Sequence, residues 1–408
     1  MRHGEGVNGV QMKRWLSVTA IVVLCLALVV GIACGGGKKE EVGVKELKMG
    51  IGIPLSGIFG AAVGVPAKYA FQLAAEDIGV FTVGGEQYRW KLIFEENYFT
   101  SAGGVASATK LIADYNVHFM HQVGADAGSA VEPITSKKGI ILDMSGGNPK
   151  QLGPDKPLLF QTAATWAINI PPFFDWLSKE HPEVKRVALV STDDATGRAE
   201  NDACIAAAEH YGLEIVAEEY IPPGMVELMP VATKVMARDP DLYVGPVTVY
   251  QLMREMGYKG LGAYYYWLET YAEQVGWDTV QGYLFCMPHP FGGLWPEAEA
   301  LGAEFEERHG VEFMPAPFWA LNVMYVITDA LRQAGIVDDI DKIVETLETG
   351  TFDSLVGPLR YGGEALNGIG HMGIWPSPIY EVIGKEEYRV LAVYTPEETE
   401  AILDEVYK

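Results

Sequence analysis

Hydrophobic residues follow two different periods in turn along the chain from residue 46 onward. Leu47, Met49, Ile51 and Ile53 occupy every second position, which predicts a strand. The apolar positions that follow recur at helical spacing and stop near Gly79, which predicts a helix. Further strands are predicted at 90–94, 117–123 and 139–144, and a helix through 111–112. This order of strands and helices indicates a parallel sheet with helices on both faces.

The same pattern starts again after Pro182. It predicts strands at 186–191, 214–220, 242–245, 263–267 and 282–287, and helices at 199–211, 227–237 and 249–256. Helices at 296–309, 316–334 and 340–349 and a β-rich stretch at 374–394 follow. Two similar α/β halves, followed by elements able to rejoin each half, predict a two-lobed protein whose chain crosses between the lobes several times. Open α/β sheets bind ligands at the carboxyl ends of their strands, so the candidate site is the cleft between the lobes.

The segment before residue 46 has the features of an export signal. Lys13 and Arg14 precede an apolar run at 15–33, and this order of charged and apolar residues is typical of a secretory signal. The residues before Met12 fit no part of that pattern, so either Met1 or Met12 is the start.

Cys34 follows the apolar run directly and is the candidate for lipidation. Ala33-Cys34 resembles the bacterial lipobox, which implies a lipid on Cys34, a signal peptide at 1–33 and a flexible glycine-rich tether at 34–45. Gly31 stands where a lipobox usually has an aliphatic residue. Two alternatives remain open: ordinary cleavage, and an uncleaved membrane helix, since about 18 apolar residues nearly span a bilayer.

Composition narrows the possible partners. The chain has 408 residues, with 30 Lys and Arg against 54 Asp and Glu, and a formal net charge of −24. Its length suggests two or three compact units. The negative balance excludes nucleic-acid binding through phosphate contacts, because such proteins concentrate Lys and Arg on one face. It also argues against docking on anionic lipid through a basic patch.

Removal of a signal at 1–33 and lipidation of Cys34 leave two cysteines in the body of the chain. Cys204 falls in a predicted helix and Cys286 in a predicted strand. An exported pair can form a disulfide, but two buried thiols are the interpretation that the pattern favours. No CxxC motif or Cys/His zinc spacing occurs, and we expect neither a metal nor a cofactor.

Motifs of catalytic and nucleotide-binding sites are missing. Residues 50–53 (GIGI) lack the third glycine of a dinucleotide fingerprint, and neither GxxxxGKS/T nor GxSxG occurs. His118 and His121 are three apart on a predicted strand, which sends them to opposite faces rather than to one metal. Asp193-Asp194 at a strand end is interpreted as a pair of acceptors for helix N–H groups, with acid/base chemistry as the alternative. We therefore do not expect an enzyme.

Four blocks of sequence, taken in order, carry a resemblance to a known family. The blocks are IGIPLSGIFGAAVGVPAKYAFQLAAEDIG at 51–79, NPKQLGPDKPLLFQTAAT at 148–165, RVALVSTDDATGRAENDACIAAAEHYGLEIVAEEYIPPG at 186–224 and FDSLVGPLRYGGEALNGIGHMGIW at 352–375. They resemble the type I periplasmic solute-binding proteins, the leucine/isoleucine/valine-binding family of ABC importers. The likeness spans roughly residues 46–394 in the family's order.

The resemblance implies an α/β fold of two lobes, the type I periplasmic-binding-protein fold. Each lobe is then a parallel-rich sheet flanked by helices, and the hinge has multiple crossings. Lobe 1 is expected at 46–162 plus 289–367, and lobe 2 at 163–288 plus 368–408.

In this family, hydroxyl and backbone N–H groups that follow strands hold the ligand carboxylate, and such groups suit an anion. At the third ligand loop this chain has Gly147 where the family has Thr, so a hydroxyl is missing. Residues 95–97 (EEN) lie at the end of a predicted strand. They either line the cleft or are solvated, and the solvated interpretation is favoured. The candidates that the resemblance assigns to these loops are Ser56, Phe59, Gly128, Ser129, Gly147 and Asn148.

An acidic side chain of the other lobe holds the ligand ammonium in this family, and an ionised acceptor suits that role. Glu269 matches this acid, with a solvated surface glutamate as the alternative. Thr196 takes the place of a ligand-stacking tyrosine. Trp166 lies where the chain crosses between lobes, and the tyrosines at 264–266, Tyr266 among them, end a strand aimed at the cleft. Plain core packing is the alternative for each aromatic residue.

These observations and the resemblance together predict a lipid-anchored, extracytoplasmic solute-binding protein of an ABC importer, in the periplasm or on the cell surface. It is expected to bind a small amino acid or related solute by hinge closure. The expected partners are this ligand, the permease subunits of the transporter, and the membrane through Cys34. Two alternatives stay open: a ligand such as an aromatic acid, an amide or a small organic acid, and a ligand-sensing ectodomain of a membrane receptor.

Overall fold

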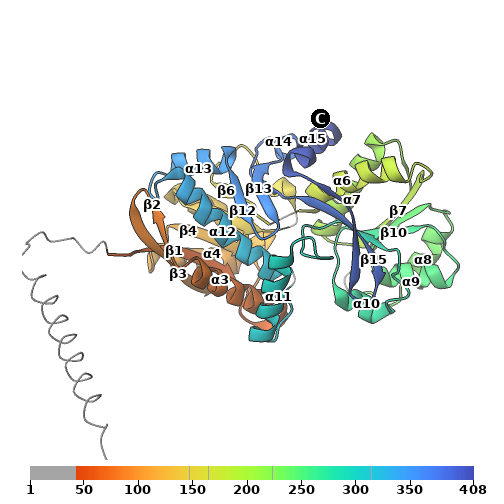
Figure 1. Ribbon diagram of the computed structural model, residues 1–408, viewed down its shortest axis with the longest axis horizontal. Helices are drawn as coiled ribbons and strands as arrows, with labels where there is room; N and C mark the ends of the chain where they lie inside the picture. The colour runs from red at the N-terminus through yellow and green to blue at the C-terminus, as the bar shows by residue number, and fades with distance from the viewer. Residues whose placement is uncertain (1–42, 147, 164, 223, 314) are drawn as a thin grey trace, which may run out of the picture. The chain divides into compact units, whose positions relative to one another are not determined.

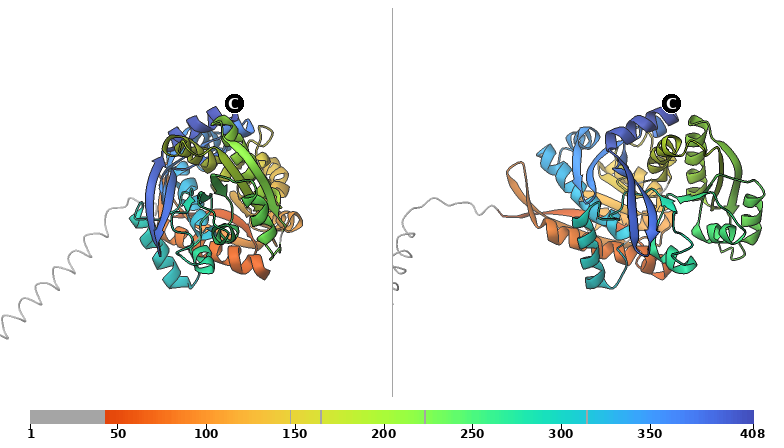
Figure 2. Two further views of the ribbon diagram at one scale, coloured as in Figure 1. Left: turned by 90° about the vertical axis from the view of Figure 1, so that its right-hand side faces the viewer. Right: turned by 45° about the vertical axis from the view of Figure 1, so that its right-hand side comes forward.

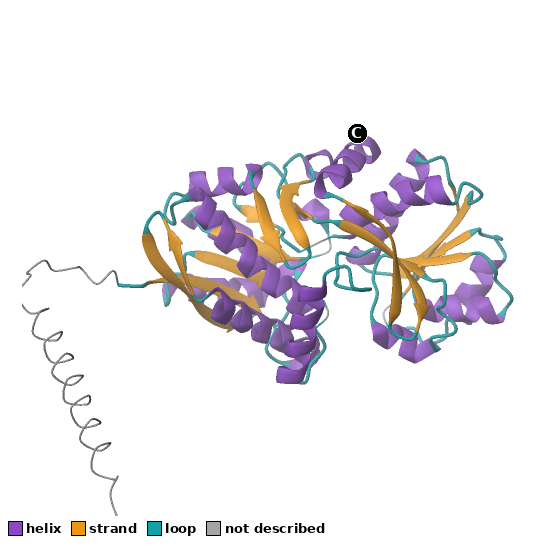
Figure 3. Ribbon diagram, in the orientation of Figure 1, coloured by secondary structure: helices purple, strands orange, loops and turns teal. Residues whose placement is uncertain are grey.

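Two mainly parallel sheets, each covered by helices, organise residues 44–408 (Figure 1, Figure 3). The structure is a computed structural model that describes residues 43–408 apart from 147, 164, 223 and 314. Within that range, no helix has both the length and the apolar character needed to cross a membrane. The expected signal peptide at 1–33, the lipidation candidate Cys34 and most of the tether lie outside the described residues.

The first sheet has the strand order β2-β3-β1-β4-β5-β6. All neighbours from β3 to β6 pair in parallel, and β2 pairs antiparallel with β3 at one edge. Every residue of β4 is buried, as expected for a central strand covered on both faces. The strands are β1 (Lys45–Ile53), β2 (Val80–Val83), β3 (Glu86–Glu96), β4 (Phe119–Val123), β5 (Ile141–Ser145) and β6 (Leu159–Phe160).

Helices from distant parts of the chain cover this first sheet. In Figure 1 the blue helix α12 lies beside the orange strands, and it packs against α3. Phe71 of α3 and Phe318 of α12 are fully buried in one core, and burial of such a side chain stabilises by about 1.5–3 kcal/mol. The helices are α2 (Gly57–Phe59), the π-helix η1 (Gly60–Gly64), α3 (Val65–Ile78), α4 (Ser101–Ala113), α5 (Ala125–Lys138), the 3₁₀-helix η2 (Pro149–Gln151), α11 (Pro296–His309), α12 (Ala316–Ala334) and α13 (Ile340–Thr349).

The second sheet has the order β16-β15-β11-β10-β9-β7-β8. Strands from β11 to β8 pair in parallel, whereas β15 and β16 add an antiparallel edge from the end of the chain. This return is visible in Figure 2, where the blue hairpin lies with the green elements. The elements are α6 (Trp166–Glu180), β7 (Arg186–Thr192), α7 (Ala195–His210), β8 (Glu214–Ile221), α8 (Met229–Met236), β9 (Leu242–Val244), α9 (Val247–Glu255), β10 (Leu261–Tyr264), α10 (Glu269–Val275), β11 (Leu284–Phe285), β15 (Ser377–Gly384), β16 (Glu387–Tyr394) and α15 (Pro396–Tyr407).

A small antiparallel sheet joins the first sheet next to the place where the chain changes sheets. It consists of β12 (Thr351–Ser354), β13 (Gly357–Gly362) and β14 (Met372–Ile374), with the short helix α14 (Glu364–Asn367) before β14. A bridge between Gln161 and Met372 links it to the end of β6. Within the described residues the chain passes between the two large sheets three times: after β6, after β11, and from β14 to β15. The indole N–H of Trp375 donates to the carbonyl oxygen of Thr162 at 2.8 Å and so ties two of these passages together.

Helix α6 carries prolines in its interior, and the last helix compensates for one of them. Pro171 has no N–H, so it cannot donate to the carbonyl oxygen of Ala167 one turn earlier. The hydroxyl of Tyr407, at the end of α15, donates to this oxygen at 3.1 Å instead. Helix α15 begins at a capping box formed by Thr395 and Glu398.

The two-lobed α/β fold expected from the sequence is confirmed, and the helices predicted at 296–309, 316–334 and 340–349 have those bounds. Cys204 and Cys286 are buried free thiols, which confirms the favoured interpretation. The expected residue bounds of the two lobes stay a prediction. The hydrophobic pattern missed the edge strand β2, strands β6, β12 and β13, and helices α5, α6, α10 and α15.

We expect Tyr407→Phe to lower the free energy of unfolding by about 1 kcal/mol, because the carbonyl oxygen of Ala167 loses its donor beside Pro171. Urea denaturation followed by tryptophan fluorescence measures the change.

The matched control is Tyr407→Phe in a Pro171→Ala background, where the alanine restores the helical N–H. There the cost of losing the hydroxyl should fall to within about 0.5 kcal/mol of zero. An equal loss in both backgrounds would contradict the compensation.

Candidate functional site

Two adjoining cavities lie where strands of both sheets end. Their volumes are about 640 Å³ and about 330 Å³, and small-molecule sites typically measure about 300–1,000 Å³. Both cavities are lined by Ser145 at the end of β5, by Tyr266 just after β10, and by Pro315 and Trp319 at the start of α12. The carboxyl ends of strands from the two sheets therefore contribute to one site, as open α/β sheets predict.

The larger cavity, termed the apolar cavity, has a mainly hydrocarbon wall. Its polar side chains include His121, Ser145, Tyr266 and Glu312. Its apolar lining includes Phe71, Phe99, Val123, Leu268, Trp319 and Ala320.

An aspartate fixes the ring of His121 in the wall of the apolar cavity. Nδ1 of His121 lies 2.6 Å from Oδ2 of Asp143 on the neighbouring strand β5. Oδ1 of Asp143 accepts the backbone N–H of Thr162 at 2.8 Å, which holds the carboxylate in place. A carboxylate only accepts, so Nδ1 is the donor and Nε2 is the ring nitrogen that remains for a ligand. His118 lies exposed just before β4, whereas His121 is buried within the strand.

The smaller cavity, termed the aromatic cavity, is walled by rings. The ring centroid of Trp166 lies 5.0 Å from that of Tyr265 and 5.3 Å from that of Tyr266. Tyr264 and Tyr265 have centroids 4.3 Å apart, and the hydroxyl of Tyr265 donates to that of Tyr264 at 3.1 Å. Such rings offer a large apolar area with few rotatable bonds.

Glu200 is the acidic side chain of the aromatic cavity, and it lines the wall together with Thr196. The residue is 5% exposed, and within the described part of the chain its carboxyl group makes no hydrogen bond or ion pair. Burial, with a smaller contribution from the charge of Asp194, raises the pKa of Glu200 from 4.5 to about 9. The carboxyl group is therefore neutral at pH 7 when no cation is beside it.

The start of helix α7 explains why Thr196 and Glu200 share this wall. Asp194 caps the helix, because its side chain accepts the backbone N–H of Gly197 at 2.8 Å. Thr196 and Glu200 are four residues apart and so lie on the same face of α7. The interpretation of Asp194 as an acceptor of helix N–H groups is confirmed, whereas Asp193 forms an ion pair with Arg198.

Ser56 and Phe59, the candidates of the first ligand loop, both contact other side chains of the protein. The hydroxyl of Ser56 donates to Glu96 at 2.8 Å, and Glu96 also accepts the backbone N–H groups of Leu55 and Tyr98. Burial opposes ionisation of Glu96, but together these hydrogen bonds lower the pKa of Glu96 below its ordinary value. Phe59 is 49% exposed and stacks on Phe99, a residue of the apolar cavity, with ring centroids 4.7 Å apart.

The candidates of the second and third ligand loops lie apart from both cavities among the described residues. Gly128 and Ser129 belong to helix α5 rather than to a loop. A Cβ on Gly128 would lie 2.8 Å from Met144, so this glycine permits close packing. The side chain of Asn148 caps η2 by accepting the N–H of Lys150 at 3.0 Å, and Gly147 lies outside the described residues.

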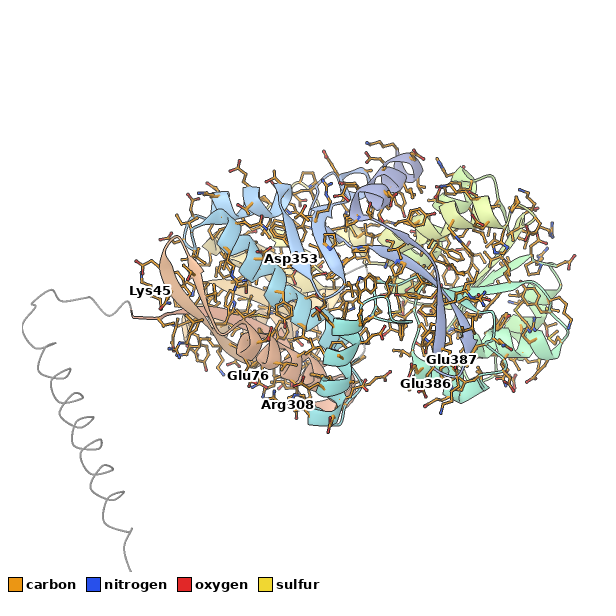
Figure 4. All side chains as sticks on the ribbon, viewed as in Figure 1. Lys45, Glu76, Arg308, Asp353, Glu386 and Glu387 are labelled. Atoms are coloured by element: carbon orange, nitrogen blue, oxygen red, sulfur yellow. The ribbon has the colours of Figure 1, made fainter. Side chains whose placement is uncertain are left out.

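The candidates Trp166, Thr196 and Tyr266 are brought together in the aromatic cavity, but Glu269 is not among its lining residues. Glu269 lines a third cavity of about 600 Å³ and accepts the hydroxyl of Tyr388 at 2.9 Å. Burial raises the pKa of Glu269 above its ordinary value. This acidic cavity is lined by the carboxyl groups of Glu269, Glu273, Glu299, Glu306, Glu312 and Glu386. Figure 4 labels Glu386 beside Glu387 at the turn between β15 and β16.

Asn97 corrects one interpretation of the sequence. We expected 95–97 to be solvated, but Asn97 is fully buried. Its amide donates to the carbonyl oxygens of Gly52 at 3.0 Å and Val123 at 2.9 Å. The side chain therefore ties together the carboxyl ends of β1 and β4 beside the apolar cavity.

Sequence reasoning missed several lining residues, among them Phe99, Ser145, Glu200, Glu312 and Trp319. One signal was available for Glu200: Thr196 was already a candidate, and a residue one helical turn later faces the same way. No local sequence pattern indicates that Trp319 lines the site, because α12 lies more than 150 residues after β5 in the sequence.

Comparison with protein families identifies the class to which this geometry belongs. The profile of the family described as periplasmic binding protein matches residues 46–382. The chain therefore belongs to the periplasmic binding protein family, which comprises extracytoplasmic proteins that bind small molecules and is not a family of enzymes. A search of curated protein sequences found no match to the chain.

Solved structures share the fold at low sequence identity. An ABC transporter substrate-binding protein from Sphaerobacter thermophilus is 19% identical, with a TM-score of 0.72 over 86% of this chain and 98% of that chain. A leucine-, isoleucine-, valine-, threonine- and alanine-binding protein from Brucella ovis is 14% identical, with a TM-score of 0.73 over 87% and 97%. A solute-binding protein from Rhodopseudomonas palustris BisB5, in complex with 3,4-dihydroxy benzoic acid, is 17% identical, with a TM-score of 0.69 over 86% and 98%.

We expect Glu200→Gln to stabilise the ligand-free protein at pH 8 but to have little effect near pH 4.5. Glu200 stays protonated in the folded protein up to about pH 9, whereas in the unfolded chain it ionises near its ordinary pKa of 4.5. The unfolded state therefore binds fewer protons in this window, and the stability of the wild type falls as pH rises through it. Thermal unfolding of both proteins between pH 4.5 and pH 9 measures the difference.

Glu209→Gln is the control, because Glu209 is an exposed glutamate on the same helix. This variant should keep the pH dependence of the wild type. If Glu200→Gln keeps it too, the buried carboxyl group is ionised in the folded protein.

Proposed function

We propose that this protein is the solute-binding component of an ABC importer. The observation that carries the proposal is the pair of adjoining cavities at the carboxyl ends of strands from both sheets, with Tyr266 and Trp319 lining both. The similar structures include an ABC transporter substrate-binding protein, an amino-acid-binding protein and a solute-binding protein in complex with an aromatic acid, which agrees with a small organic solute.

Hinge closure is the proposed mechanism. The two sheets are joined by three passages of the chain among the described residues, and one of them, from β14 to β15, spans only Trp375 and Pro376. A ligand held on one wall would recruit the other, and the closed form would be the one that the permease subunits recognise. The proposed moving bodies are 46–162 plus 289–367 and 163–288 plus 368–408.

The proposed ligand contacts divide into two groups. Trp166, Thr196 and Tyr266 have the support of lining the aromatic cavity. The other sequence candidates, Ser56, Phe59, Gly128, Ser129, Gly147, Asn148 and Glu269, rest on the family resemblance alone.

A ligand other than an aliphatic amino acid is the second candidate. The crowding of Trp166, Tyr264, Tyr265 and Trp319 around one cavity favours a flat or aromatic solute. The complex of the R. palustris BisB5 protein with 3,4-dihydroxy benzoic acid shows that the fold accommodates such solutes.

Membrane anchoring through a lipid on Cys34 completes the proposal, with the segment up to residue 45 as the tether. This location would keep the binding protein beside its permease.

A thermal-shift screen of residues 44–408 against amino acids, amines, amides and aromatic acids tests the binding function. A solute present at 100 times its dissociation constant should stabilise the protein by about 2.7 kcal/mol, which raises the unfolding midpoint visibly. The signal of a true ligand should fall strongly in Trp166→Ala and Tyr266→Ala. Absence of any shift across a broad solute library would refute the proposal.

Lipidation is tested separately in a bacterial host by mass spectrometry of the mature protein. The expected result is a diacylglyceryl group on Cys34 and its loss, with release from the membrane, in Cys34→Ser. A mature protein that retains residues 15–33 would instead support an uncleaved membrane segment and a receptor-like role.

A further inference from the structure

The charge of the ligand site points to one class of solute. Among the described residues that line the apolar and aromatic cavities, the acidic side chains are Glu200 and Glu312, and no lysine or arginine is present. Glu312 also lines the adjoining acidic cavity. A ligand carboxylate would therefore find no lysine or arginine in this wall, whereas a cation would find two carboxyl groups.

Of these two acids, Glu200 is the one that lines the aromatic cavity. It is 95% buried by residue exposure, and among the described residues no cationic side chain contributes to the shift of its pKa. The titratable groups near it are Asp194 at the N-cap of α7, Cys204 within α7, Tyr264 at the end of β10 and Tyr271 on α10. A buried carboxyl group without a partner is costly, and a positive group from a ligand removes that cost.

The surrounding rings suit a cation as well. Trp166, Tyr264 and Tyr266 line the same cavity as Glu200, and the indole of Trp166 stands edge-to-face with Tyr266. The face of an aromatic ring attracts a positive charge within about 6 Å, and tryptophan does so most strongly. An acid at the wall and rings beside it form the usual receptor for an ammonium group.

We propose that Glu200 anchors a positively charged nitrogen of the bound solute, with the rings of Trp166 and Tyr266 beside it. The apolar remainder of the solute extends through the shared wall of Tyr266 and Trp319 into the apolar cavity. The substrate class is thus an organic ammonium ion with an apolar part. This inference rests on the proposed binding function, and it assigns the ammonium contact to Glu200 rather than to Glu269.

Binding of a cation should release a proton. The empty protein holds Glu200 in its neutral form, so an incoming ammonium group pairs with the carboxylate and the carboxyl proton passes to the buffer. Isothermal titration calorimetry at pH 7.5, in phosphate and in Tris, measures the number of protons released. The expected value is close to one for the wild type and zero for Glu200→Gln.

Four probes of matched size separate the possible charges of the solute: phenethylamine as the cation, phenylalanine as the zwitterion, hydrocinnamate as the anion and phenethyl alcohol as the neutral form. We expect the wild type to prefer phenethylamine or phenylalanine, and Glu200→Gln to weaken that binding by about 30-fold or more. Glu209→Gln, on the same helix, should leave it unchanged.

The outcomes distinguish this inference from the function on which it rests. If the solutes that bind, in this panel or in the broad library, are anionic or neutral, the protein is a binding protein but the ammonium assignment is wrong. Cation binding that survives in Glu200→Gln also overturns it. If no solute of any charge binds the folded wild type, the proposed function itself fails.

Discussion

Parallel strand pairing is the constraint on which the rest of this structure depends. A parallel strand can be followed by another only after a crossover, so the chain returns to the same edge of the sheet each time and every carboxyl end lies on one side. In the first sheet this gathers the ends of β1, β4 and β5, and Asn97 ties β1 to β4 through Gly52 and Val123. In the second it presents the tyrosines after β10. The apolar and aromatic cavities lie where these two edges meet.

The hydrophobic pattern predicted the alternating α/β order well, because buried strands and amphipathic helices have different periods. It failed where another constraint governs the segment. Helix α6 was missed because Pro171 and Pro172 argue against a helix, and the compensating donor, Tyr407, lies 236 residues further along the chain. The edge strand β2 was missed because four residues are too few to show a period of two. Helix α15 was missed although a capping box marks its start.

The site was predicted only in part, for a physical reason. Local pattern and family resemblance indicate which turns approach a cleft, and this sufficed for Trp166, Thr196 and Tyr266. They do not indicate which side chain of a turn is used for capping or packing instead, as Asn148 and Gly128 are. They also leave open which of several glutamates is buried: Glu269 pairs with Tyr388, whereas Glu200 lines the aromatic cavity and has no partner among the described residues. That distinction depends on contacts between elements far apart in the sequence.

The return of the chain's end to both halves has a consequence for folding. Helix α12 completes the core of the first sheet, β15 and β16 complete the second, and Tyr407 satisfies a carbonyl oxygen in α6. Neither half can therefore bury its core from a contiguous stretch of sequence, and many stabilising contacts join residues more than two hundred positions apart. Such a high contact order slows folding and favours one cooperative transition over two independent ones. Removal of the last helix would thus destabilise α6, in the middle of the chain, rather than only the C-terminal end.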